Sequence, residues 1–221
     1  NGFKHGFTAF RFSSIVNNLS LAVLRTAFDK FRHCLCGIKV LLPISLSVGY
    51  DKPKGVEFMD ELFMKEALAL AREAFEDGEV PVGCVIVCKG NVVGRGRNRR
   101  EKGKSALAHA EIEAIEEACR TLGGWRLWEC TLYVTLEPCP MCAGAIVNAR
   151  IPRVVYGASD AKCGAVRSVC SMFSMAFNHH PQVESGIREA EATALLTEFF
   201  QQLRIELRSR PKWKPREKEV L

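Results

Sequence analysis

The order of secondary-structure signals in this 221-residue chain predicts a three-layer α/β/α sandwich around a mixed sheet. A β-hairpin comes first, because two β-branched runs, 80–87 and 91–97, flank the turn Lys89-Gly90. Helix and strand patterns then alternate, and the strand–helix–strand order over residues 131–157 implies a parallel crossover. Antiparallel and parallel pairs are therefore expected within one sheet.

Apolar residues at helical spacing locate the helices. The first helix opens at Met59 and stops at Gly78, and the second ends at Gly123-Gly124. A third begins at Pro140, where the missing N–H of proline is harmless, and the last covers residues 187–209. For the second and the last helix we predict core-facing stripes: Ile112, Ile115, Cys119 and Leu122, and Leu196, Phe199, Phe200, Leu203 and Leu207.

Composition narrows the class of protein. A chain of this length holds one well-filled domain with extensions rather than two large domains. Its ten cysteines are scattered and form no secreted disulfide framework, which indicates a reducing compartment. The net charge of +6 is consistent with a nucleic-acid partner without establishing one. Basic residues gather in a loop at 97–104, at Arg150 with Arg153, and over 204–218, where together they would suit phosphate contacts.

The main functional signal is His109-Ala110-Glu111 together with Pro138-Cys139-Pro140-Met141-Cys142. These segments fill each fixed position of H-x-E…P-C-x-x-C, the signature of zinc nucleobase deaminases. The candidate metal ligands are His109, Cys139 and Cys142. Catalytic zinc sites have three such ligands and an open position for water, whose pKa zinc lowers to about 7. The resulting hydroxide could attack a ring carbon that carries an amine, with Glu111 as the proton shuttle.

Two other interpretations of the cysteines are open. The C-x-x-C pair could be a redox pair, or half of a closed structural zinc site with Cys163, Cys170 or Glu111 as a further ligand. We favour catalytic zinc, because the full signature with its acid/base Glu is present. A redox pair does not need the matched H-x-E segment, and a closed structural site needs a fourth ligand. We interpret Cys163 and Cys170 as small core residues, and His179-His180, which precedes a proline, as part of a loop rather than a second metal site.

Residues 59–208 resemble the bacterial tRNA-specific adenosine deaminases, which have the cytidine-deaminase-like fold. The segments that carry the resemblance are Glu79–Gly83, Asn98, His109–Glu111, Thr135–Ala145 and Arg153–Lys162. The resemblance implies a mixed five-stranded sheet, a homodimer, one Zn²⁺ per subunit, and conversion of the wobble adenosine (position 34) of a tRNA anticodon to inosine. The chain departs from the family at Ser105-Ala106-Leu107, where the family often has Asp-Pro-Thr, so tRNA contacts of that loop do not carry over.

The same resemblance assigns substrate contacts. Asn98 matches a position that contacts the target base, and Ala110 offers a backbone amide there. Val82 and Pro138 match walls of the base pocket. Asp160 matches a loop residue beside the flanking nucleotide, where a carboxylate could accept a hydrogen bond from a ribose 2′-OH. Without the resemblance, Asn98 would be a turn residue and Asp160 a loop or helix-cap residue.

Three functions are weighed for this chain. The first is a tRNA adenosine deaminase that binds the anticodon stem-loop. The second is a zinc deaminase of a free nucleobase, nucleoside or nucleotide, of the guanine or cytidine type. The third is a non-catalytic tRNA-binding subunit, which is disfavoured because such a partner would lose the shuttle carboxylate and this chain keeps Glu111.

The two ends of the chain differ in composition from its middle. Asp29 is the only acidic residue among the first fifty. Residues 1–57 could be a transit-type leader, but we favour a poorly structured upstream extension without a role in the fold, because Met59 could be a natural start. The predicted domains are therefore 1–57 as extension, 58–209 as zinc deaminase domain and 210–221 as basic flexible tail. We expect a cytoplasmic protein without membrane association, or an organellar one if the leader is real.

Overall fold

The computed structural model describes residues 54–209, and their side chains from residue 58 onward. Most of the predicted extension and the whole predicted tail therefore lie outside the described residues. The elements, in chain order, are α2 (Lys54–Glu76), β1 (Gly83–Cys88), β2 (Asn91–Arg97), α3 (Arg100–Gly103), α4 (Ala110–Leu122), β3 (Cys130–Leu136), α5 (Pro140–Ala149), β4 (Arg153–Ala158), the short 3₁₀ helix η1 (Met172–Ser174), β5 (Gln182–Ser185) and α6 (Glu189–Ser209).

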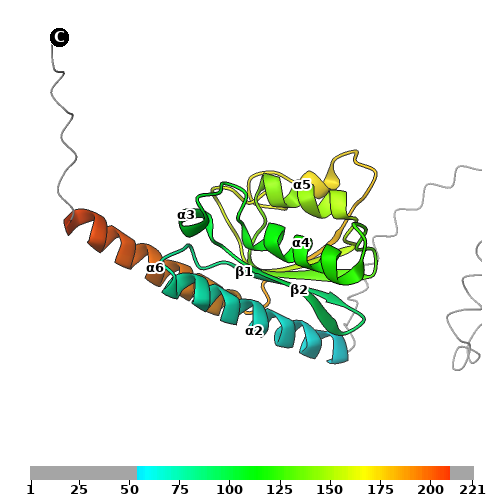
Figure 1. Cartoon of the computed structure of the whole chain (residues 1–221), viewed down its shortest axis with the longest axis horizontal. Coiled ribbons are helices and arrows are strands. Elements are labelled where there is room, and N and C mark those ends of the chain that lie inside the picture. Colours follow the sequence, from blue (N-terminus) through cyan, green and yellow to red (C-terminus); the bar gives the residue numbers. More distant parts are fainter. Residues whose placement is uncertain (1–53, 210–221) are drawn as a thin grey trace, which may run out of the picture. The chain divides into compact units, whose positions relative to one another are not determined.

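A single five-stranded sheet carries these helices, with strand order β2-β1-β3-β4-β5. Strand β1 pairs antiparallel with β2 and β3, and the pairs β3–β4 and β4–β5 are parallel. Helices α4 and α5 cover one face of the sheet, and α2 and α6 cover the other (Figure 1). The predicted three-layer sandwich with a mixed sheet is confirmed.

The predicted core stripe of α4 is correct only in part: Ile115 and Cys119 pack against the core, but small residues occupy the most buried positions of the helix. Leu122 is 44% exposed, and Ile112, Ile115 and Cys119 are only partly buried. The apolar positions that α4 buries are Ala110, Ala114 and Ala118. The cause lies in the partner strand, because a Cβ at Gly94 or Gly96 of β2 would overlap the carbonyl oxygens of Ala114 and Ala110. The helix backbone lies directly against β2, and only small side chains fit on that face.

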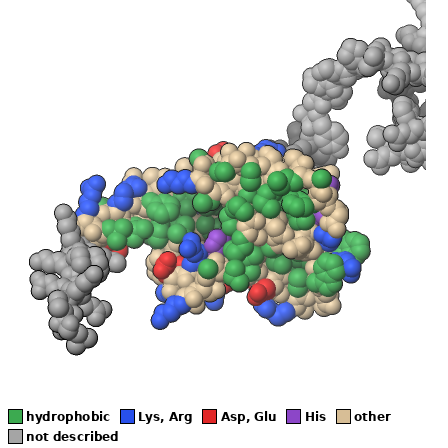
Figure 2. Space-filling view, turned by 90° about the horizontal axis from the view of Figure 1, so that it is seen from above, with side chains coloured by type: hydrophobic (Ala, Val, Ile, Leu, Met, Phe, Trp, Pro, Cys, Tyr) green, Lys and Arg blue, Asp and Glu red, His purple; other side chains and the backbone are tan. Residues whose placement is uncertain are grey.

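The predicted core stripe of α6 is correct only for its first half. Phe199 is buried and packs edge-on against Phe75 of α2, with ring centroids 5.6 Å apart. Phe200 is 41% exposed and Leu207 53% exposed, because the last turns of α6 extend beyond the sheet (Figure 1). Apolar and basic side chains lie together on the surface that α6 forms (Figure 2).

A buried ionic cluster fastens α2 to the sheet. Asp60 is 1% exposed, and its carboxylate accepts hydrogen bonds from the Tyr133 hydroxyl at 2.8 Å and from Arg153 at 2.9 and 2.7 Å. Arg153 also pairs with Glu184 at 2.9 Å. This basic residue is therefore committed to internal pairs rather than to phosphate.

Three smaller expectations differ from the structure. The first helix begins at Lys54 rather than Met59, and the basic segment 97–104 contains the short helix α3 rather than a continuous loop. Cys163 and Cys170 are exposed rather than core residues.

Among the helices of the described range, none is both long and apolar enough to cross a membrane.

Candidate active site

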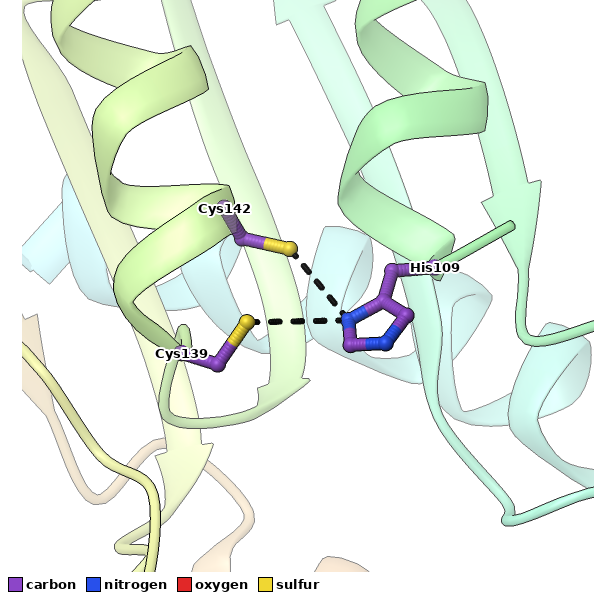
Figure 3. Close-up of side chains that lie close together, drawn as sticks. All are labelled: His109, Cys139 and Cys142. Atoms are coloured by element: carbon purple, nitrogen blue, oxygen red, sulfur yellow. Dashed lines mark hydrogen bonds between the residues drawn. The ribbon is translucent and has the colours of Figure 1, made fainter. Parts of the chain in front are cut away.

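Two helix N-termini meet at the candidate metal site. His109 is the N-cap residue of α4, and Cys139 is the N-cap residue of α5, with Cys142 in the first turn of the same helix. The His109 Nδ1 atom lies 3.6 Å from the Cys139 Sγ and 3.5 Å from the Cys142 Sγ (Figure 3). The motif segments, some thirty residues apart in the chain, thus direct three donor atoms toward one point.

The donor atoms have the spacing that a tetrahedral zinc ion requires. Zn–N bonds of about 2.0–2.1 Å and Zn–S bonds of about 2.3 Å at a tetrahedral angle place nitrogen and sulfur about 3.6 Å apart. Among residues 58–209, no fourth His, Cys, Asp or Glu joins the group. The residues therefore fit a three-ligand site with an open position, and the closed structural site considered from the sequence is not formed by these residues.

The protonation of the two thiols suits a cation. Hydrogen bonds from Cys142 and His109 lower the pKa of Cys139 to about 4, so one thiolate is present at neutral pH. The pKa of Cys142 is raised by its hydrogen bond with Cys139 and by burial. A metal ion held by these residues would take the place of the remaining thiol proton, because ligand thiols bind as thiolates.

Glu111 lies beside the donor group in the first turn of α4 and is 4% exposed. Burial raises the pKa of its carboxyl to about 7. Residues two apart on a continuous helix point to nearly opposite sides, but His109 precedes the helix with an extended backbone, φ −88° and ψ 151°. This change of backbone conformation lets both side chains serve one site.

A cavity of about 530 Å³ opens above the donor group, a size typical of small-molecule sites. Of the residues assigned to substrate by resemblance, Val82, Asn98, Ala110 and Asp160 line this cavity together with Glu111. Pro138 is buried and is not among the lining residues. The resemblance did not assign several further lining residues: Val80, Arg100, Leu136, Glu137, Ser159, Ala161, Lys162, Cys163, Leu196 and Phe200.

One wall of the cavity is held by Glu79, which sequence reasoning missed. This carboxylate is 1% exposed and accepts a hydrogen bond from the Asn98 side-chain amide at 3.3 Å. It also accepts the backbone N–H groups of Glu101 at 3.2 Å and Lys102 at 2.7 Å, at the start of α3. Glu79 therefore fixes the orientation of Asn98 and the position of the neighbouring basic turn.

The opposite wall is held by Glu137, which is 2% exposed. Its carboxylate accepts the Ser168 hydroxyl and four loop amides, those of Asp160, Val166, Arg167 and Ser168, at 2.7–3.1 Å. Burial raises the pKa of Glu137, but the hydrogen bonds from Ser168 and the loop amides outweigh burial and hold it below its usual value. A buried acid directly before the Pro-Cys motif is the sequence signal that could have identified this role.

The basic residues near the site divide into free and committed groups. Arg100 and Lys162 line the cavity. Arg97 instead pairs with Glu73 at 2.5 Å and Asp77 at 2.8 Å, and Arg150 donates to the Val147 carbonyl at 2.7 Å. Within residues 58–209, the basic surface near the site is therefore smaller than the number of charges suggests.

Comparison with known proteins identifies the class. Residues 58–204 match the family model of the MafB19-like deaminases, in agreement with the sheet topology and the His-Cys-Cys group. The chain is 49% identical over 146 residues to the tRNA-specific adenosine deaminase of Bacillus subtilis (strain 168), covering 66% of this chain and 91% of that protein. It is also 49% identical over 145 residues to the protein of that name from Agrobacterium fabrum, covering 65% and 95%. The chain belongs to the tRNA-specific adenosine deaminase family.

Solved structures agree with this assignment. A structure from a study of A-to-I editing by tRNA:A34 deaminases at the wobble position of transfer RNA superimposes with a TM-score of 0.59 at 50% identity, covering 61% of this chain and 99% of that one. A guanine deaminase from Nitrosomonas europaea superimposes with a TM-score of 0.51 at 24% identity, covering 67% and 93%. The similarity to the guanine deaminase, at 24% identity, supports the fold alone.

Proposed function

We propose that this chain is a zinc-dependent tRNA adenosine deaminase that hydrolyses the wobble adenosine (position 34) of a tRNA anticodon to inosine and ammonia. The observation that carries the proposal is the position of a buried carboxylate, Glu111, beside a three-donor group on the floor of a base-sized cavity. The identity to the curated relatives supports the choice of tRNA over a free nucleobase.

The proposed chemistry divides between a metal ion and the protein. Zinc held by His109, Cys139 and Cys142 would supply water activated at neutral pH. Glu111, with a pKa near neutrality, can take the proton of that water and deliver it to the ring nitrogen next to the attacked carbon. A second proton transfer through the same carboxylate releases the amine as ammonia. The burial of Glu111 keeps bulk water away from this proton.

The walls of the cavity would orient the base. Asn98, held by Glu79, presents a side-chain amide to the polar edge of the purine. Val82 contributes an apolar surface, and Ala110 offers its backbone N–H at the start of α4. Pro138 remains a predicted pocket wall that would act through its neighbours, because Pro138 does not itself line the cavity.

The rim of the cavity suits a strand of RNA rather than a free base. Arg100 and Lys162 can meet phosphates on either side of the base, and such contacts make binding salt-dependent. Asp160 can accept a hydrogen bond from a ribose 2′-OH. The proposed partner is therefore the anticodon stem-loop of tRNA, bound by a homodimer with one Zn²⁺ per subunit; a cytoplasmic location likewise remains an expectation.

The test uses the zinc-loaded full chain with a tRNA or an anticodon stem-loop that carries A34. Inosine is read as G on sequencing, so we expect A-to-G conversion at that position alone, with release of ammonia. Free adenosine, cytidine and guanine serve as competing substrates. Ammonia from a free base without conversion of tRNA would support the second function instead, and binding of tRNA without either reaction would support the non-catalytic subunit.

A further inference from the structure

Two cysteines face each other at the end of the sheet remote from the metal site. Cys88 is the last residue of β1 and Cys130 the first residue of β3, and they are direct partners in the antiparallel register. Strand β3 has seven residues and so separates Cys130 from the catalytic end of the sheet by about 20 Å. Both thiols are free.

Directly opposed residues satisfy the geometry of a disulfide. Cα atoms across an antiparallel pair lie about 4.5 or 5.5 Å apart, and disulfides span Cα distances of about 4.4–6.8 Å. Both cysteines point to the same face of the sheet, where they belong to the core beneath α4. The thiols could therefore be joined with little movement of either strand.

A second cavity gives small molecules access to this pair. It has a volume of about 800 Å³ and is lined by both cysteines together with Arg126 and Trp128. Cys130 is 1% exposed, whereas Cys88 is half-buried at the cavity wall. Trp128 is 65% exposed, so the cavity lies at the surface and not within the core.

We infer that Cys88 and Cys130 form a cross-strand dithiol that a low-molecular-weight disulfide oxidises to an intramolecular disulfide. The Cys88 thiolate attacks one sulfur of the small disulfide, a mixed disulfide forms, and the other half leaves as a thiolate. The Cys130 sulfur then attacks the Cys88 sulfur and expels the second half. Two cysteines are oxidised, one disulfide is reduced to two thiols, and the two cysteine protons end on the released thiols.

The order of the two steps follows from the surroundings. Burial and the neighbouring Cys88 thiol raise the pKa of Cys130 to about 12, so Cys130 is a poor first nucleophile. Cys88 is the more exposed partner, and its modification removes one of the groups that disfavour the Cys130 thiolate. The third thiol nearby, Cys119 on α4, provides a matched control because it is partly buried in the same core.

The experiment exposes the zinc-loaded full chain to excess oxidised glutathione, blocks the remaining thiols with an alkylating reagent and maps the peptides by mass spectrometry. Digestion with trypsin and chymotrypsin cuts after Lys89 and Tyr133, which separates Cys130 from the metal ligands. We expect a peptide that joins Cys88 to Cys130 and disappears with dithiothreitol. It should be absent in Cys88→Ser and Cys130→Ser and present in Cys119→Ser.

Two results would overturn the inference: alkylation of both thiols after oxidation, or a stable glutathione adduct on Cys88 with Cys130 still alkylated. A link from Cys88 to Cys119 would also refute the assigned pair. Tandem mass spectra of the linked peptide, which also contains Cys84, assign the bridge to Cys88 even if a serine variant does not fold. Because no activity is measured, the outcome is independent of the proposed deaminase function.

Discussion

Asp60 and Glu111 are both almost fully buried carboxylates, but they lie in opposite kinds of surroundings. Asp60, at the junction of α2 with the sheet, is enclosed by the Arg153 guanidinium and the Tyr133 hydroxyl. Glu111 faces a cavity, and burial raises its pKa to about 7. Burial alone therefore does not mark a catalytic acid: an acid with a fixed cationic partner stabilises the fold, and one that faces a cavity can exchange a proton.

We expect removal of the metal ion to have the largest effect on activity. We expect a strong chelator to abolish deamination completely and to lower the unfolding temperature, because the two thiols and the imidazole are then left without the charge that holds them together. Added Zn²⁺ should restore both. Zinc content, inosine formation and thermal unfolding are measured on the same samples. Full activity in a preparation free of metal would contradict the zinc chemistry assigned to this cavity.

The Glu111→Gln variant tests the catalytic side of the comparison. The amide keeps the shape of the side chain but cannot shuttle a proton, so we expect the rate of inosine formation to fall about 10²–10⁴-fold. Its free energy of unfolding should stay unchanged or rise, because a buried titratable group is removed. If the variant is inactive only because it unfolds, Glu111 has a structural role like that of Asp60 and the catalytic assignment is wrong.

The Asp60→Asn variant tests the structural side. Removing one partner of a buried ion pair leaves Arg153 with Glu184 as its remaining carboxylate partner, and we expect unfolding to become easier by up to about 3 kcal/mol. Activity per folded molecule should remain near that of the unmodified chain. The control is Glu61→Gln on the same helix, whose partner Arg188 lies 3.5 Å away and whose side chain is 46% exposed. That change should cost less than about 1 kcal/mol; equal losses in the two variants would contradict the argument.

The convergence of His109, Cys139 and Cys142 was predictable because the H-x-E and P-C-x-x-C segments are recognisable patterns of residue types. Each segment also places its donors locally, because His109 and Cys139 are both N-cap residues and a proline follows Cys139. The supporting acids Glu79 and Glu137 were missed because most of their partners are backbone N–H groups, which every residue except proline carries and which leave no pattern in the sequence. Only the tertiary structure brings those amides to them.

The errors in the helix faces have the same origin. The apolar pattern of α4 favoured its large residues, but the glycines of β2 admit only alanines beneath the helix. The pattern of α6 continues past the last strand, and periodicity carries no information on where the sheet stops. The apolar periodicity of a segment predicted that it forms a helix. The packing of the neighbouring strand or sheet determined which face of that helix is buried.

We expect the smallest effect from a substitution of Glu79. Like Asp60, Glu79 is a fixed structural acid, but its partner Asn98 lines the cavity that Glu111 faces. In Glu79→Gln an amide nitrogen would face N–H donors, so we expect unfolding to become easier by about 1–3 kcal/mol. If Glu79 acts by orienting Asn98, kcat/KM for the stem-loop should fall about tenfold, the value of one hydrogen bond to the base. The exposed Glu101→Gln is the control, since only its backbone N–H contacts Glu79.

The decisive measurement combines Glu79→Gln with Asn98→Ala. A double variant no slower than Asn98→Ala alone means that Glu79 acts through the Asn98 amide. Additive losses would mean that Glu79 acts on the substrate by another route.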